Sequence, residues 1–264
     1  MSMNIKAYWE NRLSNQFDLS GVGFTQLGKQ YNRWLYRVRK AVFHQKIKPL
    51  PEDVQNAHVL DIGVGTGFYV ERWQELGVSQ IVGLDLTETA VSHLRRRYPK
   101  YEFYQADIGG DLEPLTGKTF ELISAFDVLF HIVDDALYQQ ALNNIYSLLK
   151  PGGFFIFSDN FLHVEPVVAS HQVCRRLDTI QQWLTASQFE IVDRFPMFYL
   201  MNMPLDTRNV ALITGWKVLN RLVTQSELGG FFVGALLYPL ERLLIARFNE
   251  SPTTEIMICR RPLD

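Results

Sequence analysis

The chain has 264 residues, of which 47% are hydrophobic and 20% charged, and its formal net charge is -2. This composition indicates a globular protein with a full core and excludes a disordered chain. With 26 basic and 28 acidic side chains, nothing calls for a nucleic-acid partner. The cysteines, Cys174 and Cys259, lie far apart and fit no metal-ligand spacing. We therefore expect a reduced cytoplasmic protein without a metal.

The N-terminal segment is rich in aromatic and basic side chains at helical spacing, as in YNRWLYRVRKAVFHQKI. Pro49 and Pro51 end this segment, because proline interrupts a helix. We expect an N-terminal helical extension or lid over residues 1–50, followed by the main domain over 51–264.

From position 57 onward, short apolar runs alternate with helical patterns. Strands are expected at AHVLDI, QIVGLDL, YEFYQAD, FELISAFDV, FFIFSDN, FEIVDRF and TTEIMICRR, with helices at 67–76, 87–98, 134–149 and 173–187. Strands separated by helices pair in parallel through right-handed crossovers. The sequence therefore predicts a doubly wound α/β sheet.

A long connection separates the last two predicted strands, far beyond the usual four to six residues or so. We expect a helical insertion at about 197–251, made of two helices broken near Gly229-Gly230. Its most apolar stretch, residues 228–240, is shorter than the roughly 20 residues of a transmembrane helix, so none is expected. Three uses of this helical pair stay open: a cover over a pocket, a homodimer surface, or contact with a membrane.

The stretch VLDIGVGTGFYV at 59–70 joins a strand to a helix through alternate glycines. Three ligands would suit such a turn: a nucleoside triphosphate, a dinucleotide or S-adenosylmethionine. A phosphate-binding P-loop needs a lysine after its glycines, and none follows Gly67. The G-x-G-x-G spacing differs by one residue from the dinucleotide motif. Asp61, directly before the turn, would repel a pyrophosphate but attract a cation.

Two further acids follow the next two predicted strands. Asp85 ends QIVGLD, where a carboxylate can accept from both hydroxyls of a ribose, and Asp107 follows YQA, where it can accept from an adenine amino group. Each acid alone is as well explained by a helix cap or a solvated loop. Three acids at three successive strand ends around one glycine turn favour S-adenosylmethionine.

These motifs resemble those of the class I S-adenosylmethionine-dependent methyltransferases, over residues 57–195 and the last strand. Besides VLDIGVGTG, GLDLT and QADI, the segments FELISAFDVLFHI and LLKPGGFFIFSD match the family pattern. The resemblance implies a Rossmann-like seven-stranded sheet with an antiparallel last strand. It also implies cofactor-binding roles for Asp61, Gly63, Gly65, Gly67, Asp85, Leu86, Asp107, Ile108, Phe126 and Asp127.

A sulfonium methyl group is already activated, so a methyltransferase needs a general base only when its acceptor must lose a proton. His131, in DVLFHIVDD, is the candidate base; the competing interpretation is a histidine that packs the loop before the helix. His163, Glu165 and His171 follow the fifth strand, where this family borders its acceptor pocket. For each of these three taken alone, a solvated side chain is the favoured interpretation.

The N-terminal aromatic side chains Tyr31, Trp34 and Tyr36 are candidates for a lid over the sulfonium. Arg37 or Arg39 would then reach the methionine carboxylate of the cofactor. The alternative is a helix that simply packs Trp34 on the sheet.

We expect methyl transfer to a small-molecule acceptor. The apolar insertion suggests an apolar, glycan or lipid-linked molecule, and the acceptor atom (O, N or C) stays open. Base-amino methylation of nucleic acid is disfavoured, because AFDV stands where Asn-Pro-Pro-Tyr would be needed. The rival hypotheses are a non-catalytic S-adenosylmethionine-binding protein and a nicotinamide-dependent oxidoreductase.

Overall fold

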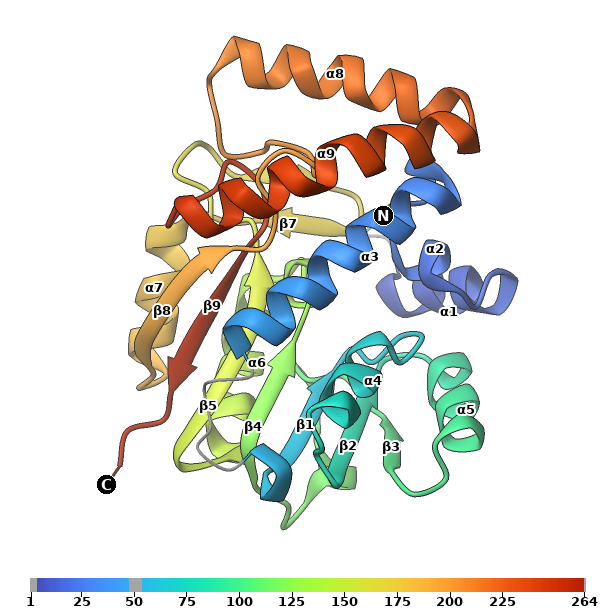
Figure 1. Ribbon diagram of the computed structural model, residues 1–264. Coiled ribbons are helices and arrows are strands. Elements are labelled where there is room, and N and C mark those ends of the chain that lie inside the picture. The colour runs from blue at the N-terminus through green and yellow to red at the C-terminus, as the bar shows by residue number, and fades with distance from the viewer. Residues whose placement is uncertain (1–3, 48–53, 264) are drawn as a thin grey trace.

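A seven-stranded sheet forms the centre of the computed structural model, which describes residues 4–47 and 54–263 (Figure 1). The strand order is β3-β2-β1-β4-β5-β9-β8. Its strands are β1 (His58–Ile62), β2 (Gln80–Asp85), β3 (Glu102–Gln105), β4 (Phe120–Ala125), β5 (Leu149–Asp159), β8 (Glu190–Pro196) and β9 (Glu255–Arg260). Strands β1 to β5 pair in parallel, and β9 is antiparallel to both β5 and β8. The predicted doubly wound sheet with an antiparallel last strand is confirmed.

Helices cover the sheet on both faces. Successive side chains of a strand point to opposite sides, so neighbouring residues of one strand enter different cores. In β1, Val59 joins the core beneath the helices α3 (Gly28–Val42) and α4 (Phe68–Glu75), whereas Leu60 joins the core beneath α6 (Asp135–Leu148) and α7 (Leu177–Ala186). The core is thus divided into two layers by the sheet. The carboxyl ends of β1, β2 and β4 lie together at one edge, where the site described below is formed (Figure 1).

Helix starts follow the local capping signals. The Thr87 side chain accepts from the Ala90 N–H at the start of α5 (Glu88–Arg97), and Asp134 Oδ1 accepts from the Leu137 N–H at 3.0 Å at the start of α6. The prediction of a helix at 173–187 was wrong for its first residues, since α7 begins at Leu177. Residues Gln172–Cys174 form β7, which pairs with β6 (Val167–Ala169) in a small separate hairpin.

The insertion between β8 and β9 contains the helices α8 (Val210–Gln225) and α9 (Glu227–Arg247). They are separated at Ser226, not at the two glycines as expected, because Ser226 is extended and its Oγ accepts from the Gly229 N–H at 2.9 Å. Gly230 and, one turn further on, Gly234 permit close packing of α9 on α3. A Cβ at Gly230 would lie 3.3 Å from Cβ of Tyr31. A Cβ at Gly234 would lie 2.2 Å from Cδ1 of Trp34.

Within residues 4–47, three α-helices precede the sheet: α1 (Ile5–Asn15), α2 (Leu19–Val22) and α3, which continues as a π-helical turn over Phe43–Ile47. Helix α3 crosses one face of the sheet and lies along α9 (Figure 1). Glu227 of α9 accepts from the N–H groups of Lys29 and Gln30, at 2.9 and 2.7 Å, so it caps α3 across the chain. Pro49 and Pro51, and the expected boundary at residue 50, lie outside the described residues.

Candidate active site

The glycine turn after β1 presents bare backbone. Gly63, Gly65 and Gly67 have positive φ angles of 70, 48 and 82°, a region that side chains with a Cβ rarely adopt. A Cβ at Gly63 would also lie 2.3 Å from Cγ2 of Val128. Glycine is therefore required at position 63 for two reasons: the positive φ angle, and the close approach of the loop after β4.

Asp85, at the end of β2, holds this turn in place. Its Oδ2 accepts from the Gly65 N–H at 2.8 Å, and its Oδ1 accepts from the N–H and the hydroxyl of Thr87 at 2.9 and 2.7 Å. Burial raises the pKa of Asp85, and these hydrogen bonds oppose the rise. A carboxylate oxygen can accept two hydrogen bonds, so Oδ2 keeps capacity for a ligand hydroxyl.

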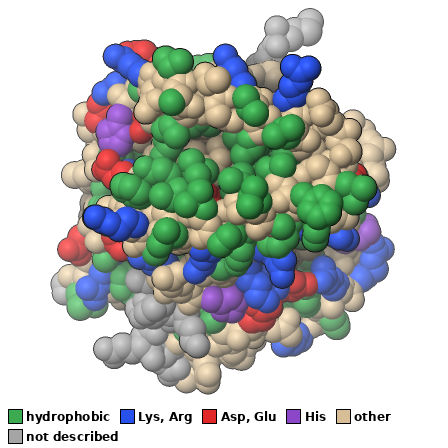
Figure 2. Space-filling model, turned by 45° about the horizontal axis from the view of Figure 1, so that its top comes forward, with side chains coloured by type: hydrophobic (Ala, Val, Ile, Leu, Met, Phe, Trp, Pro, Cys, Tyr) green, Lys and Arg blue, Asp and Glu red, His purple; other side chains and the backbone are tan. Residues whose placement is uncertain are grey.

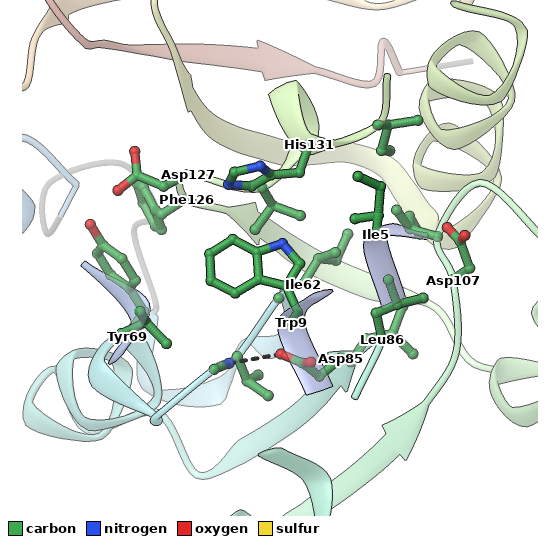
Figure 3. A pocket seen from close by; sticks show the side chains of 18 of the residues that line it. Ile5, Trp9, Ile62, Tyr69, Asp85, Leu86, Asp107, Phe126, Asp127 and His131 are labelled. Atoms are coloured by element: carbon green, nitrogen blue, oxygen red, sulfur yellow. Dashed lines mark hydrogen bonds between the residues drawn. The ribbon is translucent and has the colours of Figure 1, made fainter. Parts of the chain in front are cut away.

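A cavity of about 250 Å³ opens beside the turn and is lined by the carboxyl ends of the central strands and by α1 (Figure 3). Leu86, Asp107 and Ile108 form one end, and Tyr69, Phe126 and Asp127 form the other (Figure 3). The two ends differ in chemistry: the first combines apolar side chains with one exposed carboxylate, and the second places aromatic rings beside an ion pair.

Helix α1 covers the cavity with Ile5, Trp9 and Leu13, which are spaced four residues apart and therefore share one helix face. Trp9 lies in the middle of the cavity, below His131, and their rings make an edge contact at 4.9 Å (Figure 3). Glu10 fixes α1 to α5 by accepting from the N–H groups of Glu88 and Thr89 at 2.8 and 3.0 Å. The cover is thus anchored at the start of the helix that follows Asp85.

The polar wall is built around Asp127, which has a positive φ of 58° although it is not glycine. Its N–H donates to Ser158 Oγ at 2.7 Å, and Ser158 donates back to Oδ1 at 3.0 Å. Arg39 Nη2 donates to Oδ2 at 2.7 Å. Strained backbone of this kind persists only where its surroundings hold it, and it concentrates at functional sites.

His131 contributes a neutral imidazole. Burial lowers the pKa of His131 to about 4, and the backbone carbonyl of His171, 2.9 Å from Nδ1, opposes this only in part. Since a carbonyl oxygen accepts and never donates, Nδ1 carries the proton. Nε2 therefore keeps its lone pair and is free to accept a hydrogen bond or a proton.

Two hydroxyl groups of the lining are buried without a hydrogen-bond partner among the described residues, those of Thr66 and Tyr69. An unsatisfied buried hydroxyl costs about 1 to 3 kcal/mol. Burial raises the pKa of Tyr69 well above its usual value, so this hydroxyl stays protonated and can donate. The cavity is therefore suited to a ligand that brings polar groups.

The comparisons with known proteins agree with this geometry. Residues 59–153 match a family described as "Methyltransferase domain". Residues 59–153 thus carry a methyltransferase domain, in line with the resemblance to the class I S-adenosylmethionine-dependent family. The matched residues contain the glycine turn, Asp85, Asp107 and His131.

A probable S-adenosylmethionine-dependent methyltransferase of Mycolicibacterium smegmatis is 26% identical over 149 residues, covering 56% of this chain and 54% of that protein. An mRNA cap guanine-N(7) methyltransferase of Schizosaccharomyces pombe is 27% identical over 139 residues, covering 48% of this chain and 37% of that protein. The chain thus spans about half or less of the length of these relatives. The crystal structure of the N-methyltransferase NodS from Bradyrhizobium japonicum, solved with S-adenosyl-L-homocysteine, has 14% identity and a TM-score of 0.57. The structural match covers 98% of this chain and 100% of the NodS chain, and it supports the fold.

S-adenosylmethionine is the cofactor of this methyltransferase domain, and the residues present fit it. The bare turn at Gly63 and Gly65 admits a ligand against the backbone, and the unpartnered hydroxyls of Thr66 and Tyr69 offer hydrogen bonds. Of the ten predicted cofactor residues, Gly63, Gly65, Asp85, Leu86, Asp107, Ile108, Phe126 and Asp127 line the cavity.

Asp61 and Gly67 are not part of that lining. The Asp61 carboxyl is buried below the turn, where it accepts from the Ser124 hydroxyl at 2.6 Å. Burial raises the pKa of Asp61 to about 7. At Gly67, a Cβ would meet Cδ2 of Leu94 at 2.7 Å, so this glycine serves the packing of α4 on α5. Asp61 and Gly67 therefore support the glycine turn on the side away from the cavity.

The predicted lid residues are divided by the structure. Tyr36 and Arg39 line the cavity. Tyr31 is buried and donates to the Met201 carbonyl at 3.0 Å, and Trp34 packs against α9, with Arg37 stacked on its ring at 4.5 Å. These last three lie outside the lining. Trp34 packs on α9, whereas the alternative interpretation placed it on the sheet.

His163 and His171 also lie outside the lining. His163 is half-exposed, and its Nδ1 is hydrogen-bonded to Oδ2 of the buried Asp206 side chain at 2.6 Å. The His171 ring stacks between Tyr8, at 4.9 Å, and His131, at 5.7 Å. His171 therefore supports His131 and α1 from outside the cavity.

Sequence reasoning missed Ile5, Trp9, Leu13, Thr66 and Tyr69 as lining residues. The first three carry a readable signal, because their spacing of four residues after Asn4 is that of one helix face behind an N-cap. Nothing local, however, indicates that this face meets the carboxyl ends of strands β1, β2 and β4.

Proposed function

We propose that this protein transfers the methyl group of S-adenosylmethionine to a small-molecule acceptor, with His131 as general base. The observation that carries the proposal is a cavity beside the bare glycine turn that holds an unprotonated Nε2 and a free Tyr69 hydroxyl under the cover of Trp9. The cover over the cavity supports an acceptor small enough to be enclosed. We further propose that α1, rather than the aromatic side chains of α3, is the working lid within residues 1–50.

Each lining residue has a role in this scheme. When bound, S-adenosylmethionine supplies a methyl group on a positively charged sulfur, already activated for transfer. Asp85 and Asp107 hold the adenosine part of the cofactor, while Tyr69 donates to the acceptor or to the methionine end. Arg39 keeps Asp127 in its strained conformation, and Trp9 excludes water.

His131 takes the proton that the acceptor atom loses. With a pKa of about 4 it is a weak base, but it is neutral at physiological pH. As the new bond to the methyl carbon forms, an oxygen or nitrogen acceptor gains positive charge and its proton becomes acidic. A weak base therefore suffices, provided that it is correctly placed.

Calorimetry with S-adenosyl-L-homocysteine tests the cofactor site. We expect micromolar affinity, weakened at least about tenfold in Asp85→Ala through loss of charge-assisted hydrogen bonds. Asp85→Asn, which retains an acceptor for the turn, should lose less. Equal affinity in wild type and Asp85→Ala would refute the ribose assignment.

A labelling experiment tests the reaction and the acceptor class. The protein is incubated with methyl-labelled S-adenosylmethionine and cell extract, which is then separated into RNA and small-molecule fractions. We expect label in the small-molecule fraction, with at least about a hundredfold lower rate for His131→Phe. Label in RNA alone would instead support the activity named for the Schizosaccharomyces pombe relative. Cofactor binding without labelling would support the non-catalytic alternative.

The compartment is part of the proposal. Cys174 and Cys259 are both free and buried, which supports the expected reducing, cytoplasmic environment.

A further inference from the structure

The α8–α9 hairpin exposes an unusually large apolar surface. Figure 2 shows hydrophobic side chains gathered across this face of the molecule. On α9 they form one stripe at spacings of three and four residues: Leu228, Phe232, Leu236, Leu240 and Leu243. Phe232 is 66% exposed and Leu236 is 76% exposed. On α8, Val218 and Leu222 are exposed as well. Contiguous apolar patches of this kind mark contact sites for a partner or a membrane.

The hairpin is fixed on the domain by two carboxylates of α9. Glu227 accepts from the first N–H groups of α3, and Glu241, fully buried, accepts from the N–H groups of Tyr199 and Leu200, each at 2.7 Å. Among the described helices, α9 alone is long and apolar enough to cross a bilayer, with a mean hydropathy of 1.5. Because it is tied down near its start and beyond its middle, it is suited to lie on a surface instead of spanning a membrane.

The charges around the apolar stripe are mostly basic. Between positions 207 and 249 the sequence has five basic residues: Arg208, Lys217, Arg221, Arg242 and Arg247. The acids in this segment are Glu227 and Glu241. Five basic against two acidic side chains leave a formal net charge of +3 for this segment.

A second basic group borders the hairpin on α3. Arg33, Arg37 and Lys40 are exposed on one helix face, and with Trp34 and Phe231 they line an open cavity of about 420 Å³. Lys40 is paired with Glu75 at 2.8 Å, whereas the structure shows no acid within ion-pair distance of Arg33 or Arg37 among the described residues. Phe231 belongs to α9, so the basic group is continuous with the hairpin.

We propose that the α8–α9 hairpin docks the protein onto a bilayer surface that contains anionic lipids. The apolar stripe enters the boundary between headgroups and acyl chains, and the basic side chains of α8, α9 and α3 meet the anionic headgroups. A second copy of this chain is a poorer occupant, because it would bring the same unbalanced positive charge to the contact.

Flotation with lipid vesicles tests the proposal on the full chain. We expect the protein to float with vesicles of equimolar phosphatidylcholine and phosphatidylglycerol, and much less with pure phosphatidylcholine. The double variant Phe232→Glu/Leu236→Glu should lose at least about tenfold in partitioning, because two inserted apolar side chains become charged. The matched control is Val192→Glu, since Val192 is 47% exposed on β8, away from the hairpin, and should change nothing.

Charge variants separate the two parts of the mechanism. Lys217→Gln and Arg221→Gln should each lower binding to the anionic vesicles by about fivefold and leave binding to neutral vesicles unchanged. Circular dichroism and the thermal midpoint confirm that each variant is folded. The proposal is overturned if the wild-type protein does not bind anionic vesicles. It is equally overturned if the double variant binds them as strongly as the wild type does. It is also overturned if light scattering without lipid finds a dimer that the double variant dissolves.

Discussion

The cofactor side and the cover side of the cavity are built in different ways. The cofactor side uses backbone: a turn with positive φ angles at Gly63 and Gly65, and a carboxylate, Asp85, at the next strand end. The cover uses side chains of α1, anchored by Glu10, and a chain of packing from α3 to α9. The first depends on short-range geometry and tolerates little change, whereas the second depends on contacts between distant segments.

The largest effect on cofactor affinity is expected at the turn. Gly63→Ala would place a Cβ 2.3 Å from Val128 at a φ of +70°, so we expect cofactor affinity to fall about a hundredfold. Gly117→Ala is the matched control, because Gly117 has a φ of +77° with nothing within 4 Å of its Cβ position. Calorimetry should find the affinity of the control unchanged. Equal losses in both variants would show that backbone strain, not close approach, governs the turn.

The next effect is expected in the hairpin. Glu241→Ala leaves buried N–H groups of the 199–201 loop without an acceptor, so the free energy of unfolding should fall by about 4 kcal/mol. Under conditions in which the variant is folded, its cofactor affinity should stay within about twofold of the wild-type affinity. A twofold change is a small binding free energy beside the expected loss of stability. The control Glu250→Ala removes a surface ion pair with Arg194 and should cost less than about 1 kcal/mol. A large loss of cofactor affinity in Glu241→Ala would mean that the two regions are coupled.

A smaller, pH-dependent effect is expected from Asp61 below the turn. Its folded pKa of about 7 lies above its ordinary value of 3.8, so folding favours the protonated form. That contribution is present below pH 3.8 and is lost as the pH rises towards 7. Asp61→Asn should therefore raise the free energy of unfolding of the cofactor-free protein at pH 8, by on the order of 3 kcal/mol, and little at pH 4. Denaturant unfolding that gives the same difference at both pH values would contradict this account.

The smallest effect is expected at the anchor of the cover. Burial alone would raise the pKa of Glu10, but hydrogen bonds from Thr89 and Glu88 outweigh it and lower the pKa. Its stabilising contribution is therefore present above its ordinary value of 4.5 and is lost as the pH falls through the lowered value. Glu10→Gln should loosen α1 by about 0.5 kcal/mol, since the group is partly exposed and its interactions are weakened by solvent. Hydrogen exchange of α1 amides should be about twofold faster than in wild type at pH 7. Equal exchange rates would show that Glu10 does not anchor α1.

The same contrast explains what the sequence could predict. The strands follow from apolar runs and the helix starts from capping residues such as Thr87, because these signals are local. The antiparallel last strand was expected only from the family resemblance, and β9 confirms it. The placement of Trp9 over the cavity, and of Trp34 against Gly234, depends on segments up to about 200 residues apart, so no window of sequence contains it. The break at Ser226 was missed because Gly229-Gly230 is the stronger turn signal, although here those glycines serve helix packing.

A crystal structure with S-adenosyl-L-homocysteine bound tests the central claim most directly. The account predicts the ligand against the backbone of Gly63 and Gly65, its ribose on Asp85, its adenine between Leu86 and Ile108, and its sulfur towards Phe126 and His131. It also predicts that Trp9 is displaced with α1 while the turn keeps its conformation. A ligand bound elsewhere, or an unchanged Trp9 beside a remodelled turn, would contradict it.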